Sequence, residues 1–149
     1  MSTTITIPQG LGYTFASLIS TCFVLVWQGS VVGKHRKAAK VPYPQAYAEK
    51  AEAEASLDAK KFNCAQRAHQ NTLENVPIML ILTAITAVQY PVVAAGGLGV
   101  YNVGRILYTA GYVTGDPAKR MRGSIGYLGV FALLGGAGLT TYNFICAGL

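Results

Sequence analysis

The chain has 149 residues, of which 52% are hydrophobic and 12% are charged, about half the charged fraction of a typical soluble domain. This composition excludes an intrinsically disordered chain, and three cysteines are too few for a disulfide scaffold. The net charge of +6 does not indicate a nucleic-acid partner, because the basic residues lack the interleaved aromatic side chains on which bases stack.

The charged residues cluster in two segments. Residues 34–74 hold thirteen of the eighteen and residues 116–122 hold four, so that Arg105 stands alone in an otherwise uncharged stretch. A helix needs about 20 predominantly apolar residues to cross the hydrocarbon core of a bilayer. The uncharged stretches therefore predict an all-α integral membrane protein with one domain (1–149). Its crossings are expected at roughly 10–33, 70–90, 95–114 and 124–147, within the four helices of a bundle that run roughly over 10–33, 62–90, 92–114 and 124–147.

The basic residues also predict the orientation of the chain in the membrane. With four crossings, the loops 34–61 and 115–123 lie on one side and both termini lie on the other. Ten of the twelve Lys and Arg residues fall in these two loops. The positive-inside rule places both loops in the cytosol, where they are also attracted to anionic lipid headgroups.

Local signals refine the predicted helices in chain order. Trp27 lies near the cytosolic end of the first helix, as an interfacial aromatic residue should. Residues 46–61 are rich in Ala, Glu and Lys, which fits either a short exposed helix or a flexible loop. Pro77 falls inside the second helix and Pro91 opens the third. The fourth helix is rich in Gly and Ala, which favours close helix packing in lipid.

Two of the predicted helices carry a polar face. In the run FNCAQRAHQNTLENVP, a polar face is formed by Asn63, Arg67, Asn71 and Glu74, which follow the helical rhythm i, i+4, i+8, i+11. The third helix repeats this pattern with Tyr101, Arg105, Tyr108 and Tyr112. Ionisable residues inside a membrane helix are costly and point by default to function. The two faces predict a polar cleft near the cytosolic side.

The charges on these faces suggest a class of ligand. Arg67 and Glu74 are also consistent with a structural ion pair. Arg105 is consistent either with an ion pair to Glu74 or with a side chain that extends to the membrane–water interface. However, two arginines and one glutamate leave an unbalanced positive charge that calls for an anion. Arginines bind carboxylates and a glutamate binds an ammonium group, so the set matches glutathione, whose thiol needs a nearby cation to ionise.

The same residues carry a family resemblance. The run FNCAQRAHQNTLENVP and the run GRILYTAGYVTGDPAKRMRG closely resemble the MAPEG family, membrane-associated proteins of eicosanoid and glutathione metabolism, and within it the microsomal glutathione transferase branch. The resemblance covers nearly the whole chain. It implies a homotrimer of four-helix subunits, with glutathione bound between neighbouring subunits at the cytosolic side.

The resemblance also implies roles for individual residues. Carried over position by position, the glutathione contacts are Arg36, Arg67, Asn71, Glu74, Arg105, Tyr108 and Tyr112. The arginine that stabilises the thiolate lies just before the fourth helix, where the spacing admits Arg122 and Arg120, with Arg122 preferred. The leukotriene-forming branch of the family has a glutamine at the position of His69 and a tyrosine at the position of Asn75. The contacts that this glutamine and this tyrosine make are therefore not carried over to the present sequence.

The activity implied is that of a glutathione transferase or peroxidase. The enzyme would activate glutathione for attack on a hydrophobic electrophile or a lipid hydroperoxide, and leukotriene C4 synthase-type activity is also known in the family. No metal is expected, because His35 and His69 lack partners at metal-ligand spacing. The family's usual location is the endoplasmic reticulum, with the mitochondrial outer membrane as an alternative. A non-enzymatic membrane assembly protein is the competing reading, and a transporter fits less well because no inverted repeat is visible.

Overall fold

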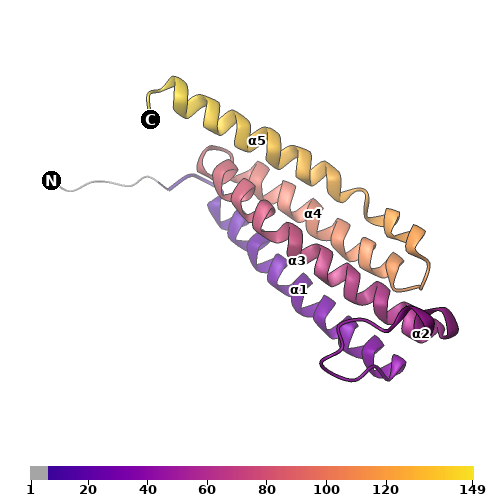
Figure 1. Ribbon diagram of the computed structural model, residues 1–149. Coiled ribbons are helices and arrows are strands. Elements are labelled where there is room, and N and C mark those ends of the chain that lie inside the picture. Colours follow the sequence, from indigo (N-terminus) through magenta and orange to yellow (C-terminus); the bar gives the residue numbers. More distant parts are fainter. Residues whose placement is uncertain (1–6) are drawn as a thin grey trace.

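Four long helices run side by side, and short elements close one end of the molecule (Figure 1). The computed structural model describes residues 7–149. The long helices are α1 (Leu11–Ala39), α3 (Leu57–Gln89), α4 (Pro91–Tyr112) and α5 (Gly126–Cys146), and the short ones are α2 (Lys50–Ala55) and the 3-10 helix η1 (Pro117–Gly123). The described residues contain no strand, so the prediction of an all-α fold is confirmed.

Three of these helices, α1, α3 and α5, are long and apolar enough to cross a membrane. Helix α4 is not among them, since polar residues such as Asn102 and Arg105 interrupt its apolar sequence. The path of the chain nevertheless requires it to cross. Helix α3 ends at one end of the bundle and α5 begins at the other (Figure 1). The 22 residues of α4 span about 33 Å, enough for the hydrocarbon core.

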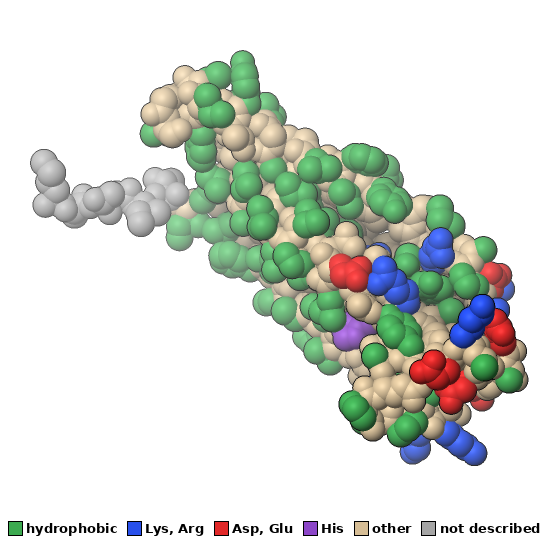
Figure 2. All heavy atoms as spheres, viewed as in Figure 1, with side chains coloured by type: hydrophobic (Ala, Val, Ile, Leu, Met, Phe, Trp, Pro, Cys, Tyr) green, Lys and Arg blue, Asp and Glu red, His purple; other side chains and the backbone are tan. Residues whose placement is uncertain are grey.

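Charged side chains gather at the end of the bundle that carries α2 and η1. On the face shown in Figure 2, the part of the long helices away from this end shows apolar side chains interspersed with neutral groups and no charged ones. Large apolar side chains such as Phe23, Phe131 and Ile145 are at least two-thirds exposed. Such a surface suits lipid, and the location of both basic loops at one end is what four antiparallel crossings require.

Two helices extend beyond their predicted ends. Helix α1 continues to Ala39, where the sequence predicted an end near residue 33, and α3 begins at Leu57, where a start near residue 62 was expected. Outside the bilayer, the Lys, Arg and Ala residues of these extensions favour a helix and need no apolar surroundings. Ser56 caps α3 by accepting a hydrogen bond from the backbone N–H of Ala59.

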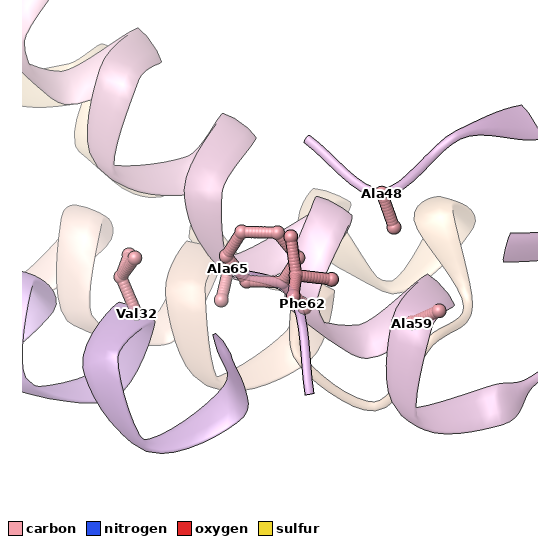
Figure 3. Close-up of a cluster of buried hydrophobic side chains, with 6 residues drawn as sticks. Val32, Ala48, Ala59, Phe62 and Ala65 are labelled. Atoms are coloured by element: carbon pink, nitrogen blue, oxygen red, sulfur yellow. The ribbon is translucent and has the colours of Figure 1, made fainter. Parts of the chain in front are cut away.

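The segment between α1 and α2 is packed onto the end of the bundle. An apolar cluster joins α1, this segment and α3 (Figure 3), and its members are Val32, Val41, Ala48, Ala59, Phe62 and Ala65. The Asn63 side chain exchanges two hydrogen bonds with the backbone of Ala48, at 2.8 and 2.9 Å. Asn63 therefore anchors this segment, and the polar face of α3 begins one turn further on.

Helices α4 and α5 approach each other through glycines. Gly104 lies against Gly126, and Gly97 lies against Gly129 and Leu133. A methyl group at Gly129 would collide with the backbone carbonyl oxygen of Gly97. The small residues that favour close packing therefore occupy the contact between these two helices, which brings η1 over the C-terminal half of α4.

This contact predicts a difference between two alanine substitutions in α5. Gly129→Ala places a methyl group against backbone that cannot yield, and it should destabilise the protein by about 1–3 kcal/mol. Gly138→Ala adds a methyl group where no atom lies within 4 Å, and it should leave stability unchanged or slightly higher. Thermal unfolding followed by circular dichroism in detergent measures both. Equal melting temperatures for the two variants would contradict the close contact.

Candidate functional site

A cleft of about 320 Å³ opens between α3, α4, η1 and the first turns of α5. Its polar side chains are Asn71, Asn75, Arg105, Tyr108, Arg120 and Ser124, and Met121, Tyr127 and Val130 give one wall an apolar character. The cleft lies where the polar faces of α3 and α4 meet. It combines positive charge with an apolar wall, which suits a ligand that has both an anionic and an apolar part.

Arg105 is fixed by neutral partners. Its Nε–H donates to the hydroxyl of Thr72 at 2.9 Å, and its Nη2 donates to Asn71 Oδ1 at 3.1 Å and to the Ala68 carbonyl at 3.4 Å. Among residues 7–149, no Asp or Glu forms an ion pair with this side chain. The cleft wall therefore carries an oriented, half-buried positive charge that no carboxylate of the described residues compensates.

Arg67 and Glu74 form an ion pair on the exposed face of α3. The Arg67 Nη1 donates to Glu74 Oε1 at 2.9 Å, and the two side chains are 44% and 47% exposed. Neither residue lines the cleft, but Asn71 lies between them in the sequence and does. Both charges of the pair thus remain accessible to a ligand next to the cleft.

Tyr47 joins this surface from the segment between α1 and α2. Its hydroxyl donates a hydrogen bond to the Gln70 side-chain oxygen. Burial raises the pKa of Tyr47 above its ordinary value, while the neighbouring Arg67 acts against this shift. At neutral pH the hydroxyl is therefore protonated, and its hydrogen holds the Gln70 side chain beside the ion pair.

Tyr108 and Tyr112 form an aromatic pair between two arginines. Their rings meet edge to face with centroids 5.5 Å apart. The Arg105 guanidinium lies 4.1 Å from the Tyr108 ring centroid, and the Arg120 guanidinium lies 5.9 Å from that of Tyr112. Cation–π contacts of this kind hold both cations near the tyrosines without neutralising them.

The two arginines of η1 occupy different positions. Arg120 lines the cleft, whereas Arg122 is absent from its lining and lies against Gly111 of α4. Spacing in the sequence admits both arginines as the residue that stabilises the thiolate, and Arg122 was the one expected there. In η1 the chain follows a 3-10 path, and this path turns Arg120 toward the cleft.

Arg36 lies apart from the cleft-lining residues. It is buried in the last turn of α1, where its Nη1 donates to the Gln45 carbonyl at 2.6 Å. Its guanidinium packs against the rings of Tyr43 and Phe62, at 4.3 and 4.5 Å from their centroids. Within one chain, Arg36 therefore holds the segment between α1 and α2 and does not join the other predicted ligand contacts.

Several residues of the site escaped the sequence analysis. Ser124 and Tyr127 belong to the turn before α5 and its first residues, and Tyr47 lies in an irregular segment. None of them extends a helical polar face, so periodicity gave no signal for them. The only available hint was the position of the basic residues of η1 directly before the fourth predicted helix.

A model of the MAPEG family matches residues 14–142. The match extends from α1 into α5 and so includes every residue of the cleft and of the ion pair. The chain therefore belongs to the MAPEG family, which confirms the resemblance noted in the sequence. The family includes glutathione transferases and enzymes of the leukotriene C4 synthase type, and its members use glutathione.

The exposure of the ion pair predicts that it contributes little to the fold. Glu74→Gln keeps the shape of the side chain and removes its charge. Because water screens a pair that is about half exposed, the ligand-free variant should melt at the same temperature as the wild type. Thermal unfolding in detergent measures this. A decrease as large as that expected for Gly129→Ala would instead identify the pair as a structural contact that stabilises α3.

Proposed function

We propose that this member of the MAPEG family is a membrane-bound glutathione transferase with peroxidase capacity. The observation that carries the proposal is Arg105, a half-buried cation on the wall of a cleft with only neutral hydrogen-bond partners. A cation held in this way is expensive unless an anionic ligand uses it. The neighbouring Arg67 and Glu74 add the further charges that a zwitterionic peptide requires.

Glutathione matches these charges group by group. Its two carboxylates pair with Arg105 and Arg67, and its ammonium group pairs with Glu74. Asn71, Tyr108 and Tyr112 supply donors and acceptors to its peptide groups. To accept the ligand, the Arg67–Glu74 pair opens, which costs little because both side chains are already half exposed to water.

Arg120 is the cation that we assign to the thiol. It is the η1 arginine on the cleft wall, next to the apolar side chains of Met121 and Tyr127. A nearby guanidinium lowers the pKa of the bound thiol and so favours the nucleophilic thiolate. Because the cation acts electrostatically, the enzyme needs no covalent intermediate of its own.

The apolar wall of the cleft receives the second substrate from the bilayer. With a hydrophobic electrophile, the thiolate sulfur attacks carbon, a C–S bond forms and the leaving group takes the electron pair. With a lipid hydroperoxide, the sulfur attacks the terminal oxygen and the O–O bond breaks. This gives the lipid alcohol and glutathione sulfenic acid, which a second glutathione converts to the disulfide and water.

The assembly and location form part of the same proposal. Members of the family generally form trimers. A homotrimer would place the exposed Arg67–Glu74 surface of one subunit near a neighbour, where Arg36 of that neighbour contributes to a carboxylate site. The one-sided basic loops orient the cleft toward the cytosol. The endoplasmic reticulum is the expected membrane, with the mitochondrial outer membrane as the alternative.

A non-enzymatic membrane assembly protein is the second candidate. The observation in its favour is that Arg67 and Glu74 already satisfy each other in the ligand-free chain. In such a protein the polar faces would serve contacts between helices, and glutathione would have no effect on stability.

The two η1 arginines predict a matched pair of variants. Binding of glutathione to the detergent-solubilised protein should give a saturable increase in ultraviolet absorbance from the thiolate. Arg120→Ala should abolish this signal and reduce turnover of an activated aryl halide by about a hundredfold, because it removes the cation that stabilises the thiolate. Arg122→Ala removes the same charge two residues away, and this variant should retain most of the thiolate signal and most of the turnover.

Three outcomes of this experiment differ in meaning. Loss of the signal in Arg122→Ala alone would transfer the thiolate role to Arg122. An equal loss of glutathione affinity in both variants, with unchanged turnover at saturation, would remove the electrostatic role from η1. The absence of any thiolate signal and of any binding by the wild type would favour the assembly protein.

A further inference from the structure

Gln28 is a fully buried amide in the middle of the bundle. It lies on α1 with 0% of its surface exposed, and the sequence analysis gave it no role. Its Nε2 donates to the hydroxyl of Thr72 on α3 at 2.9 Å and to the hydroxyl of Thr109 on α4 at 2.7 Å. Its Oε1 is buried and has no hydrogen-bond partner among the described residues. A buried acceptor without a partner costs free energy, so packing alone does not explain a glutamine here.

The hydroxyl of Thr72 is saturated by its neighbours. It donates to the carbonyl of Ala68 at 3.0 Å, and it accepts from Gln28 Nε2 and from Arg105 Nε, each at 2.9 Å. A hydroxyl has one donor and two acceptor sites, and all three are used. The hydrogen of Thr72 is therefore directed away from Arg105, and a lone pair faces the guanidinium.

Thr109 extends this arrangement to the backbone of the arginine. Its hydroxyl accepts from Gln28 and donates to the Arg105 carbonyl at 2.8 Å. Gln28 thus connects, through one threonine each, to the side chain and to the main chain of the same residue. Of the arginines that line the cleft among the described residues, only Arg105 is connected by such hydrogen bonds to a residue of α1.

We infer that Thr72 and Gln28 are positioning residues, which fix the Arg105 guanidinium in the orientation that binds a carboxylate of the ligand. The inference rests on the proposed function, because it concerns the ligand affinity of the same cleft. Thr72 acts directly on the Nε–H, which leaves the Nη groups to face Asn71 and the cleft. Gln28 does not touch Arg105. It acts through a hydrogen bond that holds the Thr72 hydroxyl in its orientation.

Helix α3 offers a control for Thr72. Thr86 is equally buried, and its hydroxyl also donates to the carbonyl four residues earlier, Leu82, at 2.7 Å. It also lies 3.2 Å from the Leu133 carbonyl on α5, so it ties two helices together without contact with any charged group. If the Thr72 hydroxyl served only the stability of the fold, replacing either threonine should therefore change the affinity for glutathione to the same extent.

The test compares Thr72→Val with Thr86→Val in the full-length, detergent-solubilised protein. Isothermal titration with glutathione should show that Thr72→Val binds about tenfold more weakly, the loss expected for one hydrogen bond to a charged group. Thr86→Val should bind like the wild type, although both variants lower the melting temperature. Thr72→Ser keeps the hydroxyl and should restore most of the affinity, which a role in packing alone would not predict.

A double-variant cycle tests the part of Gln28. Gln28→Met replaces the amide with an apolar side chain of similar size and should weaken glutathione binding by a smaller factor than Thr72→Val. In the Thr72→Val background it should have a clearly smaller effect than in the wild type, because the route through the Thr72 hydroxyl is already lost and only the contact through Thr109 remains. Fully additive losses would overturn the assigned route from Gln28 through Thr72 to Arg105.

The remaining outcomes separate this inference from the proposed function. Glutathione binding by the wild type together with equal affinity in Thr72→Val would overturn the inference and leave the proposed function standing. Equal weakening in Thr72→Val and Thr86→Val would assign the effect to stability and would also overturn it. A wild type that does not bind glutathione would overturn the proposed function, and the positioning role with it.

Discussion

The site depends on a guanidinium group that is held within a membrane-spanning bundle without a carboxylate partner. Removing such a charge from water is costly, and the bilayer offers no compensation. Arg105 is stabilised instead by oriented neutral groups, namely the Thr72 hydroxyl, the Asn71 amide oxygen and the Tyr108 ring. These groups lower the cost of the charge without cancelling it. The cation therefore remains available to an anion, which an ion pair with an internal carboxylate would have prevented.

The rest of the bundle serves to keep this arrangement rigid. Glycine contacts bring α5 close to α4, so that η1 is held over the charged end of the cleft. Close contact between backbones through small residues is the usual way in which helices associate in lipid, where apolar side chains gain little by leaving their surroundings. On the other side of α4, Gln28 ties α1 to α3 and α4 through hydrogen bonds. Packing and polar contacts thus fix the same helix from two directions.

One distribution of charge supports both the orientation in the membrane and the chemistry of the site. The charged side chains of the loops and of η1 gather at one end of the bundle (Figure 2), and residues of η1 also line the cleft. In the proposed function, the anionic, water-soluble ligand would reach this end from the aqueous side, and the positive potential there favours its approach. The apolar surface below it suits contact with lipid, from which the proposed hydrophobic substrate would arrive. The membrane interface would then bring together two substrates of opposite solubility.

The sequence alone determined the fold class, the membrane crossings and the polar faces of α3 and α4, because each depends on residues close together along one helix. The 3.6-residue period relates Asn71 to Glu74, and Arg105 to Tyr108, within their own helices. It does not state how far one helix is rotated about its axis relative to the next. Only the tertiary structure decided that Arg120 and not Arg122 faces the cleft, that Arg36 holds a surface segment, and that Gln28 reaches Thr72. These relations join residues distant in the chain, and they follow from helix packing and from the path of irregular segments, which no local pattern records.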